Sequence, residues 1–279
     1  MTAQMKLSLA IQTPEVDAEV PVALLSGTFH EKAAKAHALG ADGLELMTAE
    51  PAMLDIPDLQ RHLQAQGLVV SAVGSGAAAI VSGLTLLDSD RDRAGRARER
   101  LHELIRFAAQ MQAPLVTIGS FRGRLSTAGS NGRARLAAIL REAAELAAEH
   151  GIRLAIEPLN RYEADLVNTA EQGLAFLDEI GHGSVGLLLD TFHANIEEKS
   201  WSEPFQRAMR ADKLWHVHIG DNNRLPPGQG MIDFAKVIAI LGEIGYDGFL
   251  SAELLGQPDP DTAAKCTMAR MRALLEQQI

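Results

Sequence analysis

The stretch RLAIEPLNRYE at residues 153–163 opens with an apolar run typical of a buried strand, and this run ends in the carboxylate of Glu157. Three later stretches repeat the pattern, each reaching a polar side chain: VGLLLDTFH (Asp190), LWHVHIGD (His218) and GFLSAEL (Glu253). Helix-forming sequence follows each of them. Strands that alternate with helices pair in parallel, so their carboxyl ends open onto one face. The four side chains are therefore predicted to converge there.

The same alternation of strand and helix runs along the whole chain. Strands are predicted at 6–11, 43–47, 69–73, 115–118, 153–157, 186–190, 214–218 and 248–253. Helices are predicted between them at 29–39, 56–66, 90–112, 131–149, 169–180, 201–210, 232–244 and 259–277. Eight such repeats are the number that closes a barrel. The predicted fold class is therefore α/β, a single (β/α)8 TIM barrel in which residues 1–279 form one domain.

The composition favours a globular enzyme over a nucleic-acid-binding or membrane protein. The chain has 279 residues, 47% of them hydrophobic, and a formal net charge of −10 that repels phosphate backbones. No apolar run reaches the roughly 18 residues expected of a membrane span. The only cysteine, Cys266, excludes an intrachain disulfide. Together with the lack of a recognisable secretory leader, this predicts a cytoplasmic location.

Three carboxylates and one imidazole form a mostly oxygen donor set, which suits one divalent cation such as Mn²⁺ or Mg²⁺. His216 lies two residues before His218, so it faces the same side of the strand, one layer deeper. It is predicted to be a buried, hydrogen-bonded histidine or a partner of the metal ligand. His193 follows Asp190 by three residues, in a predicted loop, and is better placed for substrate than for the cation.

Glu157 and Glu253 belong to the first and last of these four strands, so they can flank a substrate. A carboxylate can remove a proton from a carbon next to a carbonyl, and a cation on the carbonyl oxygen would stabilise the enediolate. With one carboxylate on each face of the carbon, the proton returns on the opposite side and the centre inverts. With a single active base, ketose and aldose interconvert. The residues by themselves leave both reactions open.

Three longer motifs resemble those of the xylose isomerase-like sugar isomerase and epimerase superfamily, and most closely its D-tagatose 3-epimerase group. They are EPLNRYE at 157–163, DTFHANIEE at 190–198 and HIGDNNRLPPGQG at 218–230. The corresponding family patterns are E-x-x-N-R-[FY]-E, D-T-F-H-x-N-I-E-E and H-x-G-[ED]-x-N-R-x-x-P-G-x-G. The resemblance implies a metal-dependent ketose 3-epimerase. The implied cofactor is one divalent ion, with Mn²⁺ as the first choice and Mg²⁺, Co²⁺ or Zn²⁺ as alternatives.

The resemblance also implies roles for individual residues. The metal ligands would be Glu157, Asp190, His218 and Glu253. Glu157 and Glu253 would be the acid–base pair. Contacts to the substrate near the reacting carbons would come from Glu163, His193 and Arg224. The implied partner is a small sugar or sugar acid, and the implied assembly is a homo-oligomer, either a dimer or a tetramer.

The first half of the chain matches this group less closely. Arg122, in VTIGSFRG after the fourth strand, is predicted either to bind a carboxylate or phosphate of the substrate or to cap the barrel mouth. The loop at 74–89 either folds over the mouth or packs as ordinary structure.

Alternative activities remain open, because relatives with the same metal residues act on other substrates. They include isomerisation of hydroxypyruvate-type keto acids, and elimination from or epimerisation of 3-keto sugars and their glycosides. A repair endonuclease of the apurinic type is disfavoured by the missing histidines and the negative charge. A non-catalytic sugar-binding barrel is disfavoured by the complete set of four ligands.

Overall fold

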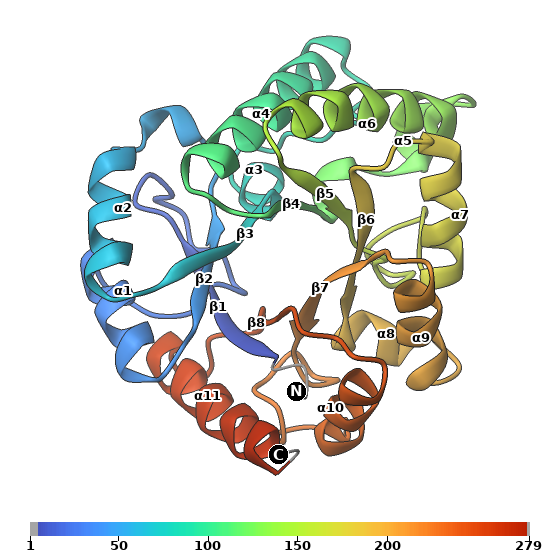
Figure 1. Ribbon diagram of the computed structural model, residues 1–279. Coiled ribbons are helices and arrows are strands. Elements are labelled where there is room, and N and C mark those ends of the chain that lie inside the picture. Colours follow the sequence, from blue (N-terminus) through green and yellow to red (C-terminus); the bar gives the residue numbers. More distant parts are fainter. Residues whose placement is uncertain (1–4, 278–279) are drawn as a thin grey trace.

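Parallel strands form a closed barrel in the computed structural model, which describes residues 5–277 (Figure 1). The order of strands around the barrel is their order in the sequence, and β8 pairs with β1 to close the ring. The strands are β1 (Lys6–Gln12), β2 (Gly43–Met47), β3 (Val69–Gly74), β4 (Leu115–Ile118), β5 (Arg153–Ile156), β6 (Val185–Asp190), β7 (Leu214–Ile219) and β8 (Phe249–Ala252). The predicted fold class is confirmed, and the strand ends differ from the predicted ones by a single residue at most.

The longer helices form an outer ring, one after each strand (Figure 1). They are α1 (Phe29–Ala38), α2 (Ile56–Ala65), α4 (Arg91–Gln110), α6 (Gly132–Glu149), α7 (Ala170–Ile180), α9 (Ser202–Arg210), α10 (Phe234–Glu243) and α11 (Pro260–Glu276). Polar caps set where they begin: Thr28 and Glu31 form a capping box at α1. Gly40 and Gly245 follow helices with φ of 77° and 74°, as glycine at this position should.

Short helical segments that the sequence did not predict lie in the loops after the strands. They are the 3₁₀ helices η1 (Pro51–Met53) and η2 (Ser120–Arg122), and the α-helices α3 (Gly76–Ile80), α5 (Leu125–Ala128) and α8 (Thr191–Glu197). They are too short to show the periodicity by which helices are predicted. One of them corrects a prediction: His193 lies in α8, not in a loop.

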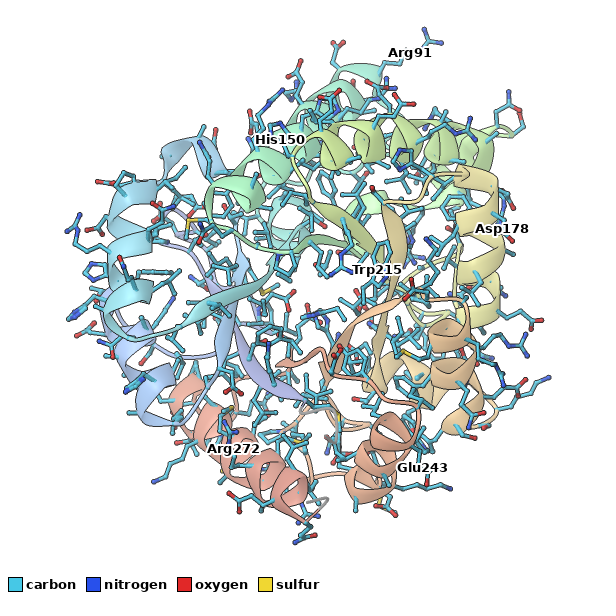
Figure 2. All side chains as sticks on the ribbon, in the orientation of Figure 1. Arg91, His150, Asp178, Trp215, Glu243 and Arg272 are labelled. Carbon is cyan, nitrogen blue, oxygen red and sulfur yellow. The ribbon has the colours of Figure 1, made fainter. Side chains whose placement is uncertain are left out.

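Two apolar layers hold the barrel together. The main core lies between the strands and the outer helices and includes Phe107, Phe176 and Phe205. A separate small cluster lies inside the barrel: Ala72, Leu115, Ala155 and Leu188, with Trp215 packed against them. Figure 2 shows side chains filling the ring of strands, whereas Arg91, Asp178 and Glu243 lie on the outside. The barrel is therefore packed with side chains and is not a pore.

Polar side chains also point into the barrel. The buried hydroxyls of Ser8 and Ser71 are hydrogen-bonded at 2.9 Å, and Glu45 contacts His216 and His218 from the opposite side of the ring. These groups lie inside the barrel below the carboxyl face, where the predicted site lies. Within residues 5–277, no helix has both the length and the apolar character needed to cross a bilayer.

Candidate active site

The four residues predicted to bind metal come together at the carboxyl ends of neighbouring strands. Glu157 directly follows β5, Asp190 ends β6, His218 is the last residue but one of β7, and Glu253 directly follows β8. One donor atom from each lies within 4.8 Å of the donor atoms of the other three. The convergence expected from the sequence is therefore present in the geometry. Glu157 and Glu253 are close enough to share one ion.

The hydrogen bonding of this cluster fits a divalent cation. Glu157 Oε1 and His218 Nδ1 are buried and have no hydrogen-bond partner. The two atoms lie 3.7 Å apart, and His218 Nδ1 lies 3.4 Å from Glu253 Oε2. Buried polar atoms without partners are costly, and an ion that they coordinate would satisfy them. Three carboxylates with one imidazole are donors that Mn²⁺ and Mg²⁺ accept.

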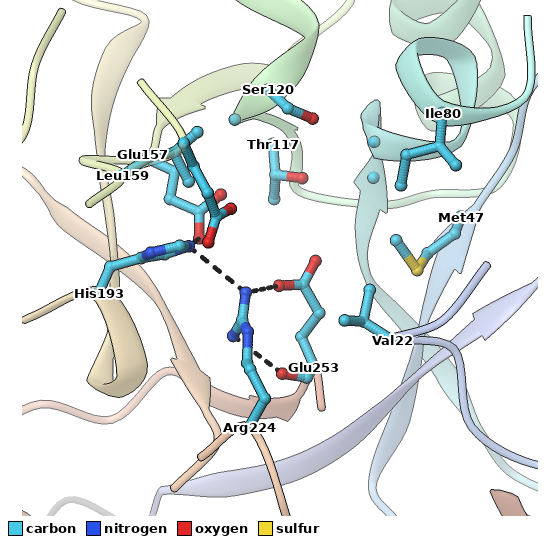
Figure 3. Close-up of a pocket in the computed structure, with 14 residues that line it drawn as sticks. Val22, Met47, Ile80, Thr117, Ser120, Glu157, Leu159, His193, Arg224 and Glu253 are labelled. Carbon is cyan, nitrogen blue, oxygen red and sulfur yellow. Dashed lines mark hydrogen bonds and ion pairs between the residues drawn. The ribbon is translucent and has the colours of Figure 1, made fainter. Parts of the chain in front are cut away.

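Arg224 provides the positive charge beside these carboxylates. Its guanidinium forms an ion pair with Asp190. It forms another with Glu253 Oε2 at 3.0 Å (Figure 3). Burial alone would raise the pKa of Asp190 and of Glu253. The positive charges of Arg224 and His218 hold both pKa values below their ordinary range instead. Both carboxylates are therefore ionised and able to bind metal or accept a proton.

The loop after β7 holds Arg224 in place through Asp221. The Asp221 carboxylate is fully buried and accepts backbone N–H groups from Gly228, Gly230 and Ile232 at 2.9–3.0 Å. Gly230 has to lack a side chain, because a Cβ there would overlap that carboxylate. Arg224 has a φ of 61°, and its own N–H donates to the carbonyl of Asp221 at 2.8 Å. Much of the motif HIGDNNRLPPGQG at 218–230 therefore forms this loop and fixes its conformation.

Asn160 connects two residues that were predicted to contact substrate. Its side-chain nitrogen donates to Glu163 Oε1 at 2.8 Å and lies 2.8 Å from His193 Nδ1. The backbone N–H of Asn160 also points at this ring nitrogen, at 3.2 Å. Since Nδ1 accepts both, the hydrogen of a neutral His193 ring is on Nε2. Nε2 lies 3.7 Å from Glu157 Oε1 and 3.4 Å from Arg224 Nη2, so this ring nitrogen borders the pocket between the two side chains.

The pocket above the cluster has a polar side and an apolar side. Figure 3 shows Glu157 and His193 facing Val22, Met47 and Ile80 across the cavity, with Glu253 between them. Thr117 and Ser120 add hydroxyl groups at the rim. Gly74, Gly76 and Ile80 also line the cavity, so the start of the 74–89 segment forms part of the cavity wall. Among the described residues that line the cavity, Arg224 is the only lysine or arginine.

Arg122 is not placed to bind a carboxylate or phosphate of the substrate. It is fully buried outside the pocket lining. Its Nη1 donates to the carbonyls of Gly119 and Glu157 at 2.9 and 2.8 Å. Its Nη2 donates to the carbonyls of Leu166 and Val167 at 2.9 and 3.2 Å. Burial lowers its pKa to about 10, against the attraction of Glu157. Arg122 fixes the loops after β4 and β5 at the carboxyl face, which is closer to the predicted cap of the barrel mouth.

Glu45 is a site residue that the sequence analysis missed. It lies in the middle of β2, is 1% exposed and accepts from His216 and His218. Burial opposes its ionisation, but both imidazoles outweigh that cost and lower its pKa well below the ordinary value. The sequence feature that could have revealed Glu45 is its charge, which interrupts the otherwise apolar run GLELM at 43–47. His216 is hydrogen-bonded and buried, as predicted.

Comparison with known proteins agrees with this geometry. Residues 33–274 match the model of the family described as "Xylose isomerase-like TIM barrel". The chain belongs to this family. The chain is also similar to a D-psicose 3-epimerase from Enterocloster bolteae, at 33% identity over 77% of this chain and 72% of that protein.

Two further proteins that resemble this chain are epimerases with other substrates. A solved structure of an L-ribulose 3-epimerase superposes with a TM-score of 0.79 at 29% identity, covering 98% of this chain and 95% of its own. A 3-dehydro-D-guloside 4-epimerase from Escherichia coli is 33% identical over 48% of this chain and 50% of its own length. Both are epimerases that act on sugars, so the likeness extends beyond the fold.

Proposed function

We propose that this protein is a metal-dependent ketose 3-epimerase that acts on an unphosphorylated sugar. The observation that carries the proposal is the convergence of Glu157, Asp190, His218 and Glu253 within 4.8 Å at the floor of the pocket. The family relatives that act on psicose and ribulose support it. Arg224 is already neutralised by two carboxylates, which leaves the described pocket lining without a free cationic group for a phosphate.

The four converging residues would hold the cation. Mn²⁺ is proposed for it from the family resemblance, and the oxygen-rich donor set can bind this ion. A divalent cation held there would act as a Lewis acid that stabilises negative charge on the substrate oxygens. Glu157 and Glu253 are the proposed acid–base pair. One carboxylate takes the proton from the carbon next to the carbonyl, and the electron pair of the C–H bond moves toward the carbonyl oxygen. The other carboxylate delivers a proton to the opposite face, so the centre inverts.

The remaining polar residues would orient the substrate. His193 presents its Nε2–H to the pocket because Asn160 donates to its other nitrogen. Arg224 and this N–H are donors that can stabilise an oxyanion as it forms. Glu163 is an acceptor for a sugar hydroxyl, held in place by Asn160 at 2.8 Å.

The first test is solvent exchange at carbon. The Mn²⁺-loaded protein is incubated in deuterated water with D-psicose, D-tagatose, D-fructose and L-ribulose. Deuterium at C3 together with the C3 epimer is expected for at least one of them. Failure to exchange C3 in every ketose would contradict the proposal.

Variants of the two glutamates distinguish their proposed role as acid and base from their proposed role as metal ligands. Glu157→Gln and Glu253→Gln each remove one base. If enough metal is retained, each is expected to abolish epimerisation but keep C3 exchange with one of the two epimers. Asp190→Asn is the matched control, because it alters a carboxylate of the same cluster that is not in the pair. It should lower exchange of both epimers equally. Loss of only one epimer's exchange in Asp190→Asn would contradict the assignment.

A second candidate is epimerisation at C4 of a 3-keto glycoside, since one relative is a 3-dehydro-D-guloside 4-epimerase. The same pair of carboxylates would then act on C4, which lies next to the C3 ketone as C3 lies next to the C2 ketone of a ketose. Deuterium at C4 of a 3-keto-glucoside, with no exchange at C3 of free ketoses, would favour it. An enone product, detected by its ultraviolet absorbance, would indicate elimination instead.

Assembly and location stay predictions. A homo-oligomer is proposed from the family resemblance, and light scattering after size-exclusion chromatography would give its mass. A cytoplasmic location is proposed from the single cysteine.

A further inference from the structure

Glu45, His216 and His218 form a fully buried polar cluster inside the barrel, next to the four converging residues. Glu45 comes from β2 and the two histidines from β7, strands that are not neighbours in the ring. Each of the three side chains is 1% exposed. Glu45 Oε2 lies 3.0 Å from His216 Nε2 and 2.9 Å from His218 Nε2. Its carboxylate therefore reaches across the interior of the barrel.

The direction of these hydrogen bonds follows from the chemistry of the groups. An ionised carboxylate can only accept, so both Nε2 atoms donate to Glu45. His218 binds a cation only as the neutral imidazole, whose ring carries a single N–H, and the contact with Glu45 puts this hydrogen on Nε2. Its Nδ1 then has a free lone pair. This is the buried atom without a partner that faces Glu157 and Glu253, 3.7 and 3.4 Å away.

By residue type the cluster could itself hold a cation, but its geometry indicates a different role. The distances from Glu45 to both imidazoles are those of direct hydrogen bonds, so the donors and the acceptor satisfy one another. His216 supplies a second donor that keeps the carboxylate turned toward β7.

We propose that Glu45 is a positioning residue that holds His218 in the tautomer with Nδ1 free to coordinate the cation, and that His216 holds Glu45. The inference rests on the proposed function, because it requires that Glu157, Asp190, His218 and Glu253 bind a metal ion. Carboxylates that accept from a metal-bound histidine fix its ring and raise its basicity as a ligand. Glu45 touches neither substrate nor ion and acts only through His218.

The experiment measures Mn²⁺ affinity by calorimetry on protein freed of metal with a chelator. Glu45→Gln keeps the shape of the side chain but removes its charge and one acceptor, and is expected to weaken Mn²⁺ binding about 10–100-fold. His216→Gln is expected to give a smaller loss. Ser71→Ala is the matched control: it removes a buried hydrogen bond of the barrel interior, to Ser8 at 2.9 Å, without touching the cluster. Its Mn²⁺ affinity should equal that of the unaltered protein.

A second measurement does not depend on whether the variants fold. Nitrogen NMR of the protein loaded with diamagnetic Zn²⁺ reports which ring nitrogen of His218 carries hydrogen. Hydrogen on Nε2 and metal on Nδ1 are expected, and the reverse would overturn the proposal. Unchanged Mn²⁺ affinity in Glu45→Gln would also overturn it while leaving the proposed function intact. No binding of any divalent cation by the unaltered protein would overturn both.

Discussion

Gly119 lies directly against the carboxylate of Glu157. A Cβ on Gly119 would overlap Glu157 Oε2, closer than real Cβ contacts come. Gly119 follows β4 and Glu157 follows β5, and these strands pair in register through Ile118 and Ile156. The absence of a side chain at one strand end is therefore what allows the carboxylate at the next to turn into the site.

Gly119→Ala is accordingly expected to impair the site. The added methyl group displaces the Glu157 carboxylate, and a misplacement of about 1 Å can cost about 10²-fold in rate. The variant should lose kcat/KM and Mn²⁺ affinity together. Gly95→Ala is the control, because a Cβ at that position meets nothing within 4 Å. Wild-type kinetics in Gly119→Ala would show that Glu157 is not held where the structure places it.

Arg122→Met is expected to destabilise the whole protein. It removes the donors for four backbone carbonyls, of Gly119, Glu157, Leu166 and Val167. Breaking such a buried charged network costs about 3–5 kcal/mol of the free energy of unfolding. Chemical denaturation measures this loss. Arg124→Met is the matched control, since Arg124 is exposed and donates only to the carbonyl of Tyr162, and should cost under about 0.5 kcal/mol.

Glu197→Gln is expected to show a pH-dependent loss of stability. The Glu197 carboxylate accepts from the backbone N–H and the guanidinium of Arg161 at 2.6–3.0 Å, joining the first two motifs. Burial alone would raise the pKa of Glu197, but these bonds lower it below 4.5. The stabilisation is therefore fully present above about pH 4.5 and is lost as the pH falls through the lower folded-state pKa.

The expected difference between the variant and the unaltered protein is about 1 kcal/mol at pH 7, because Arg161 is largely exposed and solvent screens the pair. Denaturation at a series of pH values should show this difference shrinking below pH 4.5. A difference that stays constant down to pH 3 would contradict the ionic character of the contact.

Metal binding should raise the melting temperature. The four converging residues include two buried atoms without partners, which an ion would satisfy. At a free Mn²⁺ concentration 100 times Kd, binding to the folded state adds about 2.7 kcal/mol. For a protein of this size that corresponds to an increase in Tm of roughly 5–10 °C. Asp190→Asn should reduce this increase in Tm. If the variant showed the same increase as the unaltered protein, the ion would have to bind elsewhere.

The sequence predicted the barrel and the four converging residues because their signals are local. An apolar run that ends in a carboxylate, as RLAIE does at Glu157, indicates both a strand and a polar group at its end. For Arg122 the sequence left two roles open, a contact to the substrate and a cap of the barrel mouth. Its four backbone acceptors become neighbours only when β4, β5 and the following loop have packed.

The sequence by itself therefore determined the alternation of strands and helices and the identity of the side chains at the strand ends, since each depends on residues close together in the chain. The number of repeats then predicted a barrel. The tertiary structure decided which polar groups meet inside. Glu45 and His218 are 173 residues apart and on strands that do not pair. Only closure of the ring brings them within 2.9 Å, because contacts across a barrel depend on strand register and tilt, which no local pattern encodes.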